Sequence, residues 1–211
     1  MLVRHGETPW TRARRVIGRR PVGLSDRGRA EARALVPLLA PLEPALIVTS
    51  PLVRARETAE IVRTALARPL AVDDDLAELD FGTWEGRSYD ELLADPAYLA
   101  FSRDPDRAPP PAGERGSDAH ARALGAVGRA LTATSGACVC LVTHGDLIRL
   151  LLAGFLGLER AAFRRLRIDT GGLSGVELTG DFAEVRFTNL LADPARLREA
   201  LHWRPAPDAL P

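Results

Sequence analysis

Apolar and polar residues follow two different spacings along this chain. Short apolar runs bounded by polar or turn-forming residues predict buried strands, and they occur at 2–3, 45–49, 69–72 and 137–142. Apolar side chains at three- and four-residue intervals predict helices, in segments 25–42, 50–67, 117–131 and 146–155. Further apolar runs predict closing strands, some antiparallel, at 164–168, 173–178 and 184–188. The alternation predicts an α/β fold, a three-layer α/β/α sandwich with a mostly parallel central sheet.

Local signals refine two of these helices. Ser25 is a suitable N-cap for the first long helix, and Pro37 is expected to kink or end that helix because it removes a backbone hydrogen bond. Ser50 and Pro51 read as an N-cap and a first helical residue. This start would place Arg54 in the first turn of the helix, beside the positive end of the helix dipole.

The segment 87–116 has a weaker pattern, with one short helical stretch at 88–93 and then a Pro-rich run. Long loops in compact domains often form lids or binding walls, so we expect this segment to select the substrate. Residues 9–24 read as a loop that flanks the candidate site residues at 4–6. The polar and aromatic candidates for substrate selection are Arg19, Arg20, Trp84, Arg87, Tyr89 and Arg115.

Length and charge narrow the function classes. The chain has 211 residues without a linker-like change of composition, which predicts a single domain over 1–211. Its 28 basic residues, all Arg, balance 28 acidic ones, so the net charge gives no reason to expect nucleic acid or a membrane as partner. No apolar stretch reaches membrane-spanning length. The sequence leaves open whether the chain forms a homo-oligomer.

The remaining single residues carry less information. Candidate functional residues begin at position 4, which leaves no room for a signal peptide and predicts a cytoplasmic protein. The first strand is short, so a start site placed too far downstream is an alternative. Cys138 and Cys140 are expected to be core residues, His120 to be structural or exposed, and His202 and Trp203 to serve packing.

Candidate chemistry lies where two apolar runs end. Arg4-His5-Gly6 follows the first run, and Thr143-His144-Gly145 follows the run at 137–142. If the two strands are neighbours, both imidazoles converge on one pocket at the carboxyl ends of the sheet strands. With Arg4, that pocket would be rich in donors for an anion. A single histidine at a strand end is more often structural, but two in matched contexts favour a site.

Three segments in order resemble the motifs of the histidine phosphatase superfamily, also called phosphoglycerate mutase-like: LVRHGET at 2–8, SPLVRARET at 50–58 and LAELDFGTWEG at 76–86. The resemblance extends to about residue 157. It implies the phosphoglycerate mutase-like fold and phosphoryl transfer through a phosphohistidine. On chemistry alone, Glu78, Asp80 and Glu85 compete as the catalytic acid, and the motif selects Glu78.

The resemblance also implies roles for individual residues. His5 would attack phosphorus, Arg4, Arg54 and His144 would hold the phosphate, and Glu78 would protonate the leaving group. The expected substrate-binding residues are Thr8, Thr11, Gly145, Glu114 and Arg87. Thr11 stands where the family has an Asn, and Arg115 follows Glu114 where a small hydroxyl residue is common. The resemblance implies no metal and no cofactor, and the His and Cys spacings match no zinc pattern.

Three functions stay open. The leading hypothesis is a metal-independent phosphatase for a small phosphorylated metabolite, because the segment FGTWEGRS at 81–88 resembles the phosphatase branch. Within that branch, the chain resembles α-ribazole phosphatases and broad-specificity phosphatases about equally. The alternatives are a cofactor-dependent phosphoglycerate mutase and a non-catalytic phosphate-binding relative.

Overall fold

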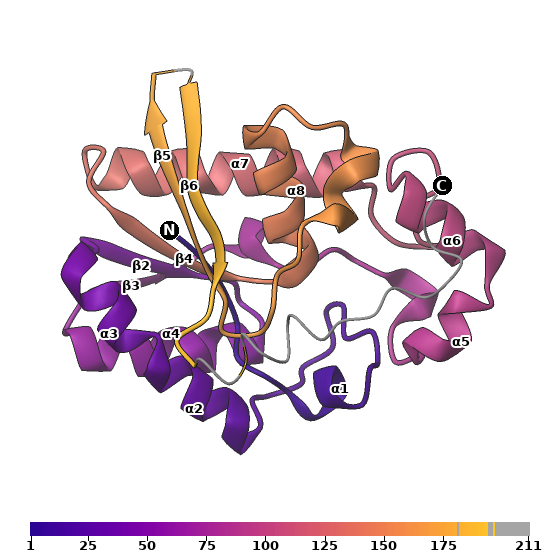
Figure 1. Cartoon of the computed structure of the whole chain (residues 1–211), viewed down its shortest axis with the longest axis horizontal. Coiled ribbons are helices and arrows are strands. Elements are labelled where there is room, and N and C mark those ends of the chain that lie inside the picture. Colours follow the sequence, from indigo (N-terminus) through magenta and orange to yellow (C-terminus); the bar gives the residue numbers. More distant parts are fainter. Residues whose placement is uncertain (181, 194–195, 197–211) are drawn as a thin grey trace.

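The computed structural model describes residues 1–180, 182–193 and 196. Six strands form one sheet in the order β3-β2-β4-β1-β5-β6 (Figure 1). The strands are β1 (Leu2–Arg4), β2 (Leu46–Thr49), β3 (Leu70–Val72), β4 (Val139–Thr143), β5 (Leu173–Thr179) and β6 (Phe182–Leu190). The first four are parallel, whereas β5 runs antiparallel to β1 and to β6.

Helices cover both faces of this sheet, which confirms the predicted three-layer α/β/α fold (Figure 1). The helices are α1 (Pro9–Arg12), α2 (Asp26–Ala34), α3 (Val36–Leu39), α4 (Val53–Leu66), α5 (Tyr89–Leu93), α6 (Pro96–Arg103), α7 (Gly116–Ala133) and α8 (Gly145–Phe155). Short 3-10 helices lie at Ala40–Leu42, Asp74–Leu76, Gly82–Trp84 and Arg160–Arg165.

Alternate side chains of the central strands build two separate cores. On β1, Leu2 packs with residues of α7 and α8, whereas Val3 packs with residues of α3 and α4. On β4, Leu141 and Val142 divide between the same two cores. Both faces of the central strands are therefore buried, which explains why these strands read as continuous apolar runs.

The predicted boundary signals hold in part. Ser25 caps α2 by accepting a hydrogen bond from Gly28 N (3.1 Å), and the chain breaks between α2 and α3 next to Pro37, as expected. The predicted N-cap role of Ser50 is wrong. The first helical residue of α4 is Val53 rather than Pro51, and Leu52 is the N-cap. Ser50 Oγ lies 2.7 Å from His144 Nε2 and accepts from Leu52 N.

Three other sequence-based assignments need correction. The segment 9–24 is not all loop, because Thr8 and Thr11 form a capping box around the short helix α1. The segment 87–116 contains α6 as well as α5, with Asp95 as the N-cap of α6. Residues 164–168 are not a strand: the chain forms a 3-10 helix up to Arg165, and the pairs to β1 come from β4 and β5.

One prediction of burial was wrong. Cys140 is a core residue as expected, but Cys138 precedes β4 and is exposed. His120 is half-buried and packs against Gly154. His202 and Trp203 lie outside the described residues.

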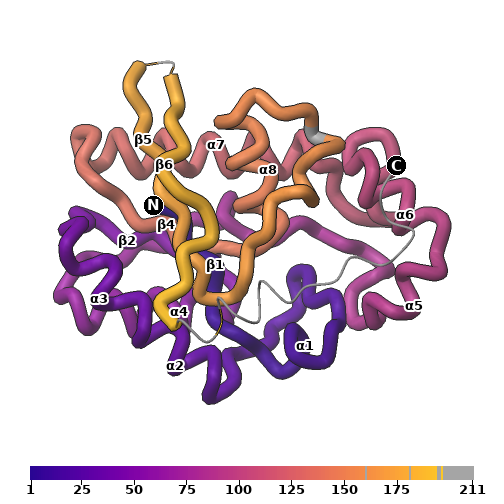
Figure 2. Tube along the Cα trace, viewed as in Figure 1, coloured from indigo at the N-terminus to yellow at the C-terminus, as the bar shows by residue number. Residues whose placement is uncertain are grey.

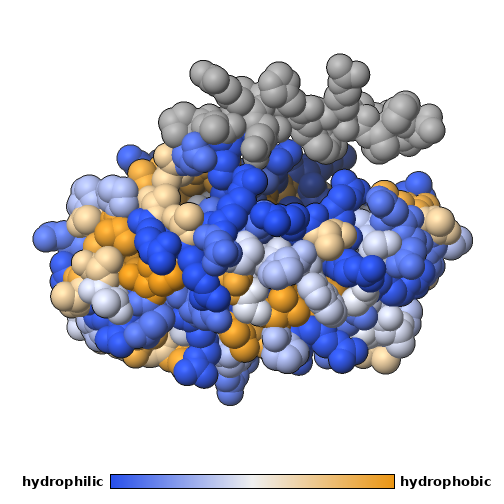
Figure 3. Space-filling view, turned by 90° about the horizontal axis from the view of Figure 1, so that it is seen from below, coloured by the Kyte–Doolittle hydropathy of each residue, from blue (hydrophilic) through white to orange (hydrophobic). Residues whose placement is uncertain are grey.

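The arrangement leaves one hairpin projecting from the body of the molecule. Figure 2 shows β1 beside β4, and the β5–β6 hairpin standing out beyond the helices. Hydrophilic side chains cover most of the face shown in Figure 3, where apolar ones form separated groups. Within the described part of the chain, we find no helix with the length and apolar character needed to span a bilayer.

Candidate active site

The two His-Gly elbows lie side by side because β1 and β4 are neighbours in register. Arg4 pairs with Thr143, so the two parallel strands end at the same level. The residue that follows each strand is a histidine, His5 after β1 and His144 after β4. The centroids of their rings are 5.2 Å apart. The convergence expected from the sequence is therefore present in the structure.

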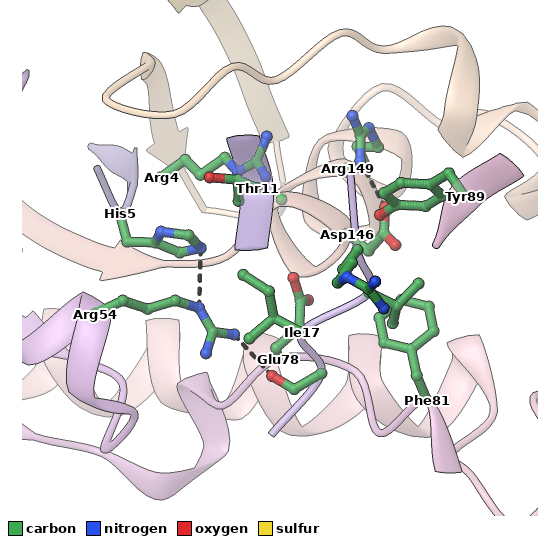
Figure 4. A pocket seen from close by; sticks show the side chains of 14 residues that line it. Arg4, His5, Thr11, Ile17, Arg54, Glu78, Phe81, Tyr89, Asp146 and Arg149 are labelled. Carbon is green, nitrogen blue, oxygen red and sulfur yellow. Dashed lines mark hydrogen bonds and ion pairs between the residues drawn. The ribbon is translucent and has the colours of Figure 1, made fainter. Parts of the chain in front are cut away.

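His5 is held in one orientation by two hydrogen bonds. Its Nδ1 lies 2.7 Å from the Gly6 carbonyl oxygen, and its Nε2 lies 3.1 Å from Arg54 Nε (Figure 4). A carbonyl only accepts and a guanidinium only donates, so Nδ1 carries the proton and Nε2 presents a lone pair. Burial, together with the charges of Arg54 and Arg4, lowers the pKa of His5 well below its ordinary value. The imidazole is neutral and basic at Nε2.

Arg54 is fixed beside this nitrogen by its position in the first turn of α4. Besides Nε, its Nη2 donates to the Gly18 carbonyl (2.7 Å) and its Nη1 to the Arg20 carbonyl (3.3 Å). The side chain is almost fully buried, and burial lowers its pKa to about 10, which still leaves it charged at neutral pH. The guanidinium thus supplies a fixed positive charge next to His5.

Arg4 and His144 offer further donors near the His5 ring. Arg4 Nη1 donates to the Ile168 carbonyl (2.7 Å), and burial lowers its pKa. Among the described residues, neither Arg4 Nε nor His144 Nδ1 has a hydrogen-bond partner, although both atoms are buried. Buried donors without an acceptor are rare in folded proteins, and an anion would satisfy both.

The second histidine has a different partner from the first. His144 Nε2 lies 2.7 Å from Ser50 Oγ, which already accepts from Leu52 N. When the Ser50 hydroxyl donates to Nε2, the proton of the neutral ring lies on Nδ1. Burial, Arg54 and His5 lower the pKa of His144, which keeps this ring neutral as well.

Glu78 reaches the same pocket from the segment before the 3-10 helix at Gly82–Trp84. Its Oε1 accepts from the backbone N–H of Leu79 (3.0 Å) and of Leu147 (3.3 Å). Burial and the charge of Asp146 raise its pKa, against the opposing effect of Arg54. Its rivals point elsewhere: Asp80 is paired with Arg19, and Glu85 with Arg20.

These groups surround a cavity of about 90 Å³ (Figure 4). Six of the predicted site residues line it: Arg4, His5, Thr11, Arg54, Glu78 and Gly145. In Figure 4, Arg4, His5 and Arg54 lie on one side of Glu78, and Tyr89, Asp146 and Arg149 on the other. The cavity therefore has two ends, which we call the histidine end (Arg4, His5, Arg54) and the distal end (Tyr89, Asp146, Arg149).

Seven lining residues escaped the sequence analysis: Arg15, Val16, Ile17, Gly18, Phe81, Asp146 and Arg149. Asp146 and Arg149 follow the second elbow within one turn of α8, so a helical projection of THGDLIR could have found them. No local signal points to Arg15, Val16 or Ile17, which the chain brings to the pocket through the irregular segment after α1.

The other predicted substrate contacts lie away from the lining. Thr8 is buried and caps α1, Glu114 pairs with Arg122 (2.7 Å), and Arg87 pairs with Asp95 (3.0 Å). His144 is fully buried and is not among the lining residues, although its ring centroid is 5.2 Å from that of His5.

Most of the residues expected to select the substrate also interact with other parts of the protein instead of lining the pocket. Tyr89 lines the distal end, whereas Trp84 is a core residue. Arg19 contacts Glu114, Arg20 contacts Glu85, and Arg115 Nη1 donates to the Asp106 carbonyl. Of the segment 87–116, it is thus Tyr89 that reaches the pocket.

A search for metal sites among residues 1–180, 182–193 and 196 finds no cluster of three or more His, Cys, Asp or Glu side chains that could hold an ion.

Comparison with known proteins shows the family of this chain. The family model of the histidine phosphatase superfamily, branch 1, matches residues 1–190. The chain belongs to this superfamily.

Its relatives include named phosphatases. It is 37% identical to the glucosyl-3-phosphoglycerate phosphatase of Mycolicibacterium vanbaalenii, over 97% of this chain and 91% of that protein. It is 30% identical to the adenosylcobalamin/alpha-ribazole phosphatase of Escherichia coli, over 89% of this chain and 94% of the relative. The solved structure of Bacillus stearothermophilus YhfR matches with a TM-score of 0.81 and 36% identity, covering 88% of this chain and 93% of the other.

Other relatives are much longer than this chain. A bifunctional protein of Mycobacterium tuberculosis is 36% identical over 90% of this chain, which spans only 53% of that protein.

Proposed function

We propose that this protein is a metal-independent phosphomonoester hydrolase that acts on a small phosphorylated metabolite through a phosphohistidine at His5. The observation that carries the proposal is the state of the His5 ring. Its Nδ1–H donates a hydrogen bond to the Gly6 carbonyl, and the lone pair on its Nε2 lies beside Arg54. A neutral imidazole with a fixed lone pair is what attack on phosphorus requires.

In the first step, a bond forms between His5 Nε2 and phosphorus, and the bond to the leaving oxygen breaks. Arg54 and the unpartnered donors Arg4 Nε and His144 Nδ1 are placed to bind the phosphate oxygens. Without substrate, the Arg54 Nε–H donates to His5 Nε2. When the phosphate binds, this N–H donates to a phosphate oxygen instead, so the His5 Nε2 lone pair is free to attack phosphorus. Thr11 and Gly145, which line the cavity, are the remaining predicted contacts on this side.

Glu78 supplies the proton. Its raised pKa favours the neutral acid, which donates to the departing alkoxide. In the second step, the resulting carboxylate takes a proton from water as the water oxygen attacks phosphorus and the bond to Nε2 breaks. His5 and Glu78 both return to their starting state.

The names of the relatives suggest the first substrates to try: α-ribazole phosphate and glucosyl-3-phosphoglycerate. We expect the segment 87–116 to contribute to this choice through Tyr89. Thr8 would affect substrate binding indirectly, by capping α1, and Glu114 and Arg87 would do so through their ion pairs. We expect the reaction to take place in the cytoplasm.

The test is turnover of p-nitrophenyl phosphate and a panel of natural monoesters in EDTA. We expect the wild type to hydrolyse them and His5→Ala to lose at least about 10⁴-fold in kcat, with no acid-labile phosphoenzyme. His120→Ala, a half-buried histidine outside the pocket, is the matched control and should keep full activity. Hydrolysis that needs a divalent ion, or that survives in His5→Ala, would contradict the proposal.

A second candidate rests on relatives of another name. A protein of Erwinia tasmaniensis called a probable phosphoglycerate mutase is 32% identical, over 83% of each chain. Isomerisation of phosphoglycerate that depends on added 2,3-bisphosphoglycerate would favour this function. Binding of phosphate esters without turnover would favour a non-catalytic relative.

A further inference from the structure

A second buried carboxyl group lies at the distal end of the catalytic cavity. Asp146, in the first turn of α8, lines the cavity together with Glu78, and both are buried. The residue after Asp146 also holds Glu78, since the Leu147 N–H donates to Glu78 Oε1. The two acids thus line one poorly solvated site, where two negative charges would repel each other and the ionisation of one acid opposes that of the other.

The partners of the two carboxyls differ. Asp146 Oδ1 is 2.6 Å from Arg149 Nη1, and its Oδ2 is 3.6 Å from Arg164 Nη2. The Glu78 Oε1 atom accepts from backbone N–H groups, which carry no full charge. Two guanidinium groups stabilise a carboxylate far more than two amides do, so the negative charge of the pair is placed on Asp146.

Arg164 is itself held by aromatic side chains. Its guanidinium carbon lies 5.4 Å from the ring centre of Tyr98, 5.1 Å from Phe101 and 5.2 Å from Phe163. Its Nε and Nη2 atoms are buried, although the side chain as a whole is 26% exposed, so the attraction of Nη2 to Asp146 is only partly screened by water. Tyr98 and Phe101 belong to α6, which thereby connects the segment 87–116 to the catalytic acid.

We propose that Asp146, kept as an anion by Arg149 and Arg164, is the positioning residue that keeps Glu78 protonated before the reaction. This inference rests on the proposed hydrolysis, in which Glu78 begins as the acid.

The charges around the pair agree with this distribution. Burial alone would raise the pKa of Asp146, but Arg164 and Arg149 bring it below its ordinary value, while the pKa of Glu78 is raised by burial and by Asp146. The groups that face the two carboxyls from the surrounding elements are Arg4, Arg54, Tyr89, Tyr98, Arg149 and Arg164. Burial and Asp146 raise the pKa of Tyr89 to about 12, so it stays neutral while the acids titrate.

The test is the pH profile of kcat/KM for Asp146→Asn with two kinds of substrate. Without the Asp146 charge, the pKa of Glu78 falls, so the alkaline limb for an alkyl monoester should move to lower pH. Each unit of this displacement means about a tenfold lower kcat/KM on that limb. p-Nitrophenyl phosphate should keep its kcat/KM within about threefold, because its leaving group departs without a proton. Asp90→Asn, an exposed aspartate on α5, is the matched control.

The outcomes separate this inference from the proposed function. A wild type that hydrolyses nothing contradicts the function itself. A wild type that is active, with an unmoved alkaline limb in Asp146→Asn or an equal loss for both substrates, overturns the role of Asp146 alone. If Asp146→Asn does not fold, Arg164→Met and Arg164→Lys replace it: the Met variant should move the limb in the same direction, and the Lys variant should restore it.

Discussion

The two His-Gly elbows begin from almost the same sequence and end with different chemistry. Both histidines follow a parallel strand, both are buried and neutral, and their rings are 5.2 Å apart. Yet the Nδ1–H of His5 donates a hydrogen bond to the adjacent Gly6 carbonyl. The His144 ring instead contacts Ser50 through Nε2, and its Nδ1 has no partner among the described residues. A motif therefore places an imidazole, and its hydrogen-bond partners decide which of its two nitrogens carries the proton.

The sharpest way to test this difference is His144→Ala, set beside His5→Ala. Loss of one preorganised donor to a phosphate oxygen should lower kcat by about 10²–10³-fold, while an acid-labile phosphoenzyme still forms slowly at His5. The measurement is rapid-quench trapping of the phosphoenzyme in both variants. A phosphoenzyme in His5→Ala that is absent from His144→Ala would reverse the two assignments.

The glycines of the elbows should differ as well, and here the expected effect is on stability. A Cβ at Gly6 would lie 2.3 Å from the Gly28 carbonyl oxygen, a backbone atom that cannot move alone. A Cβ at Gly145 would lie 3.2 Å from the Arg4 guanidinium, which can shift. We expect Gly6→Ala to lower the free energy of unfolding by about 2–3 kcal/mol and Gly145→Ala by less than about 1 kcal/mol.

Urea unfolding of both variants measures these differences. Because Gly145→Ala displaces Arg4 from its contacts, it should still reduce kcat/KM for a folded protein. Equal stability losses in the two variants would show that the first elbow tolerates a shift of the segment around Gly28.

The same contrast explains what the sequence could predict. Apolar runs identified the buried strands, and the elbow sequences identified Arg4 and His5 at the histidine end of the cavity, because both signals depend on residues close together in the chain. Among the predicted catalytic residues, Arg54 and Glu78 depended on the family motifs, since charged residues in a helix turn or loop have no pattern of their own.

The distal end was largely missed for a physical reason. Tyr89 from α5 meets Asp146 and Arg149 from α8 only through tertiary packing. Arg164, which contacts Asp146, comes from a segment that had been interpreted as a strand. Helix α6 also escaped notice, although Asp95 and Pro96 form a helix start, because its eight residues give too short a stretch for a helical spacing of apolar residues to stand out. Contacts between distant segments leave no trace in local periodicity.

The smallest effect tests what distinguishes the second elbow from the first. In Ser50→Ala, His144 Nε2 loses its 2.7 Å contact, so the ring no longer has a partner that fixes its proton on Nδ1. One neutral hydrogen bond is worth about 1 kcal/mol, and we expect kcat to fall by about five- to tenfold. Ser117→Ala, at the start of α7, is the matched control. If Ser50→Ala behaves as the wild type, the proton of His144 is placed by the bound phosphate rather than by the protein, and the difference between the elbows arises only when substrate binds.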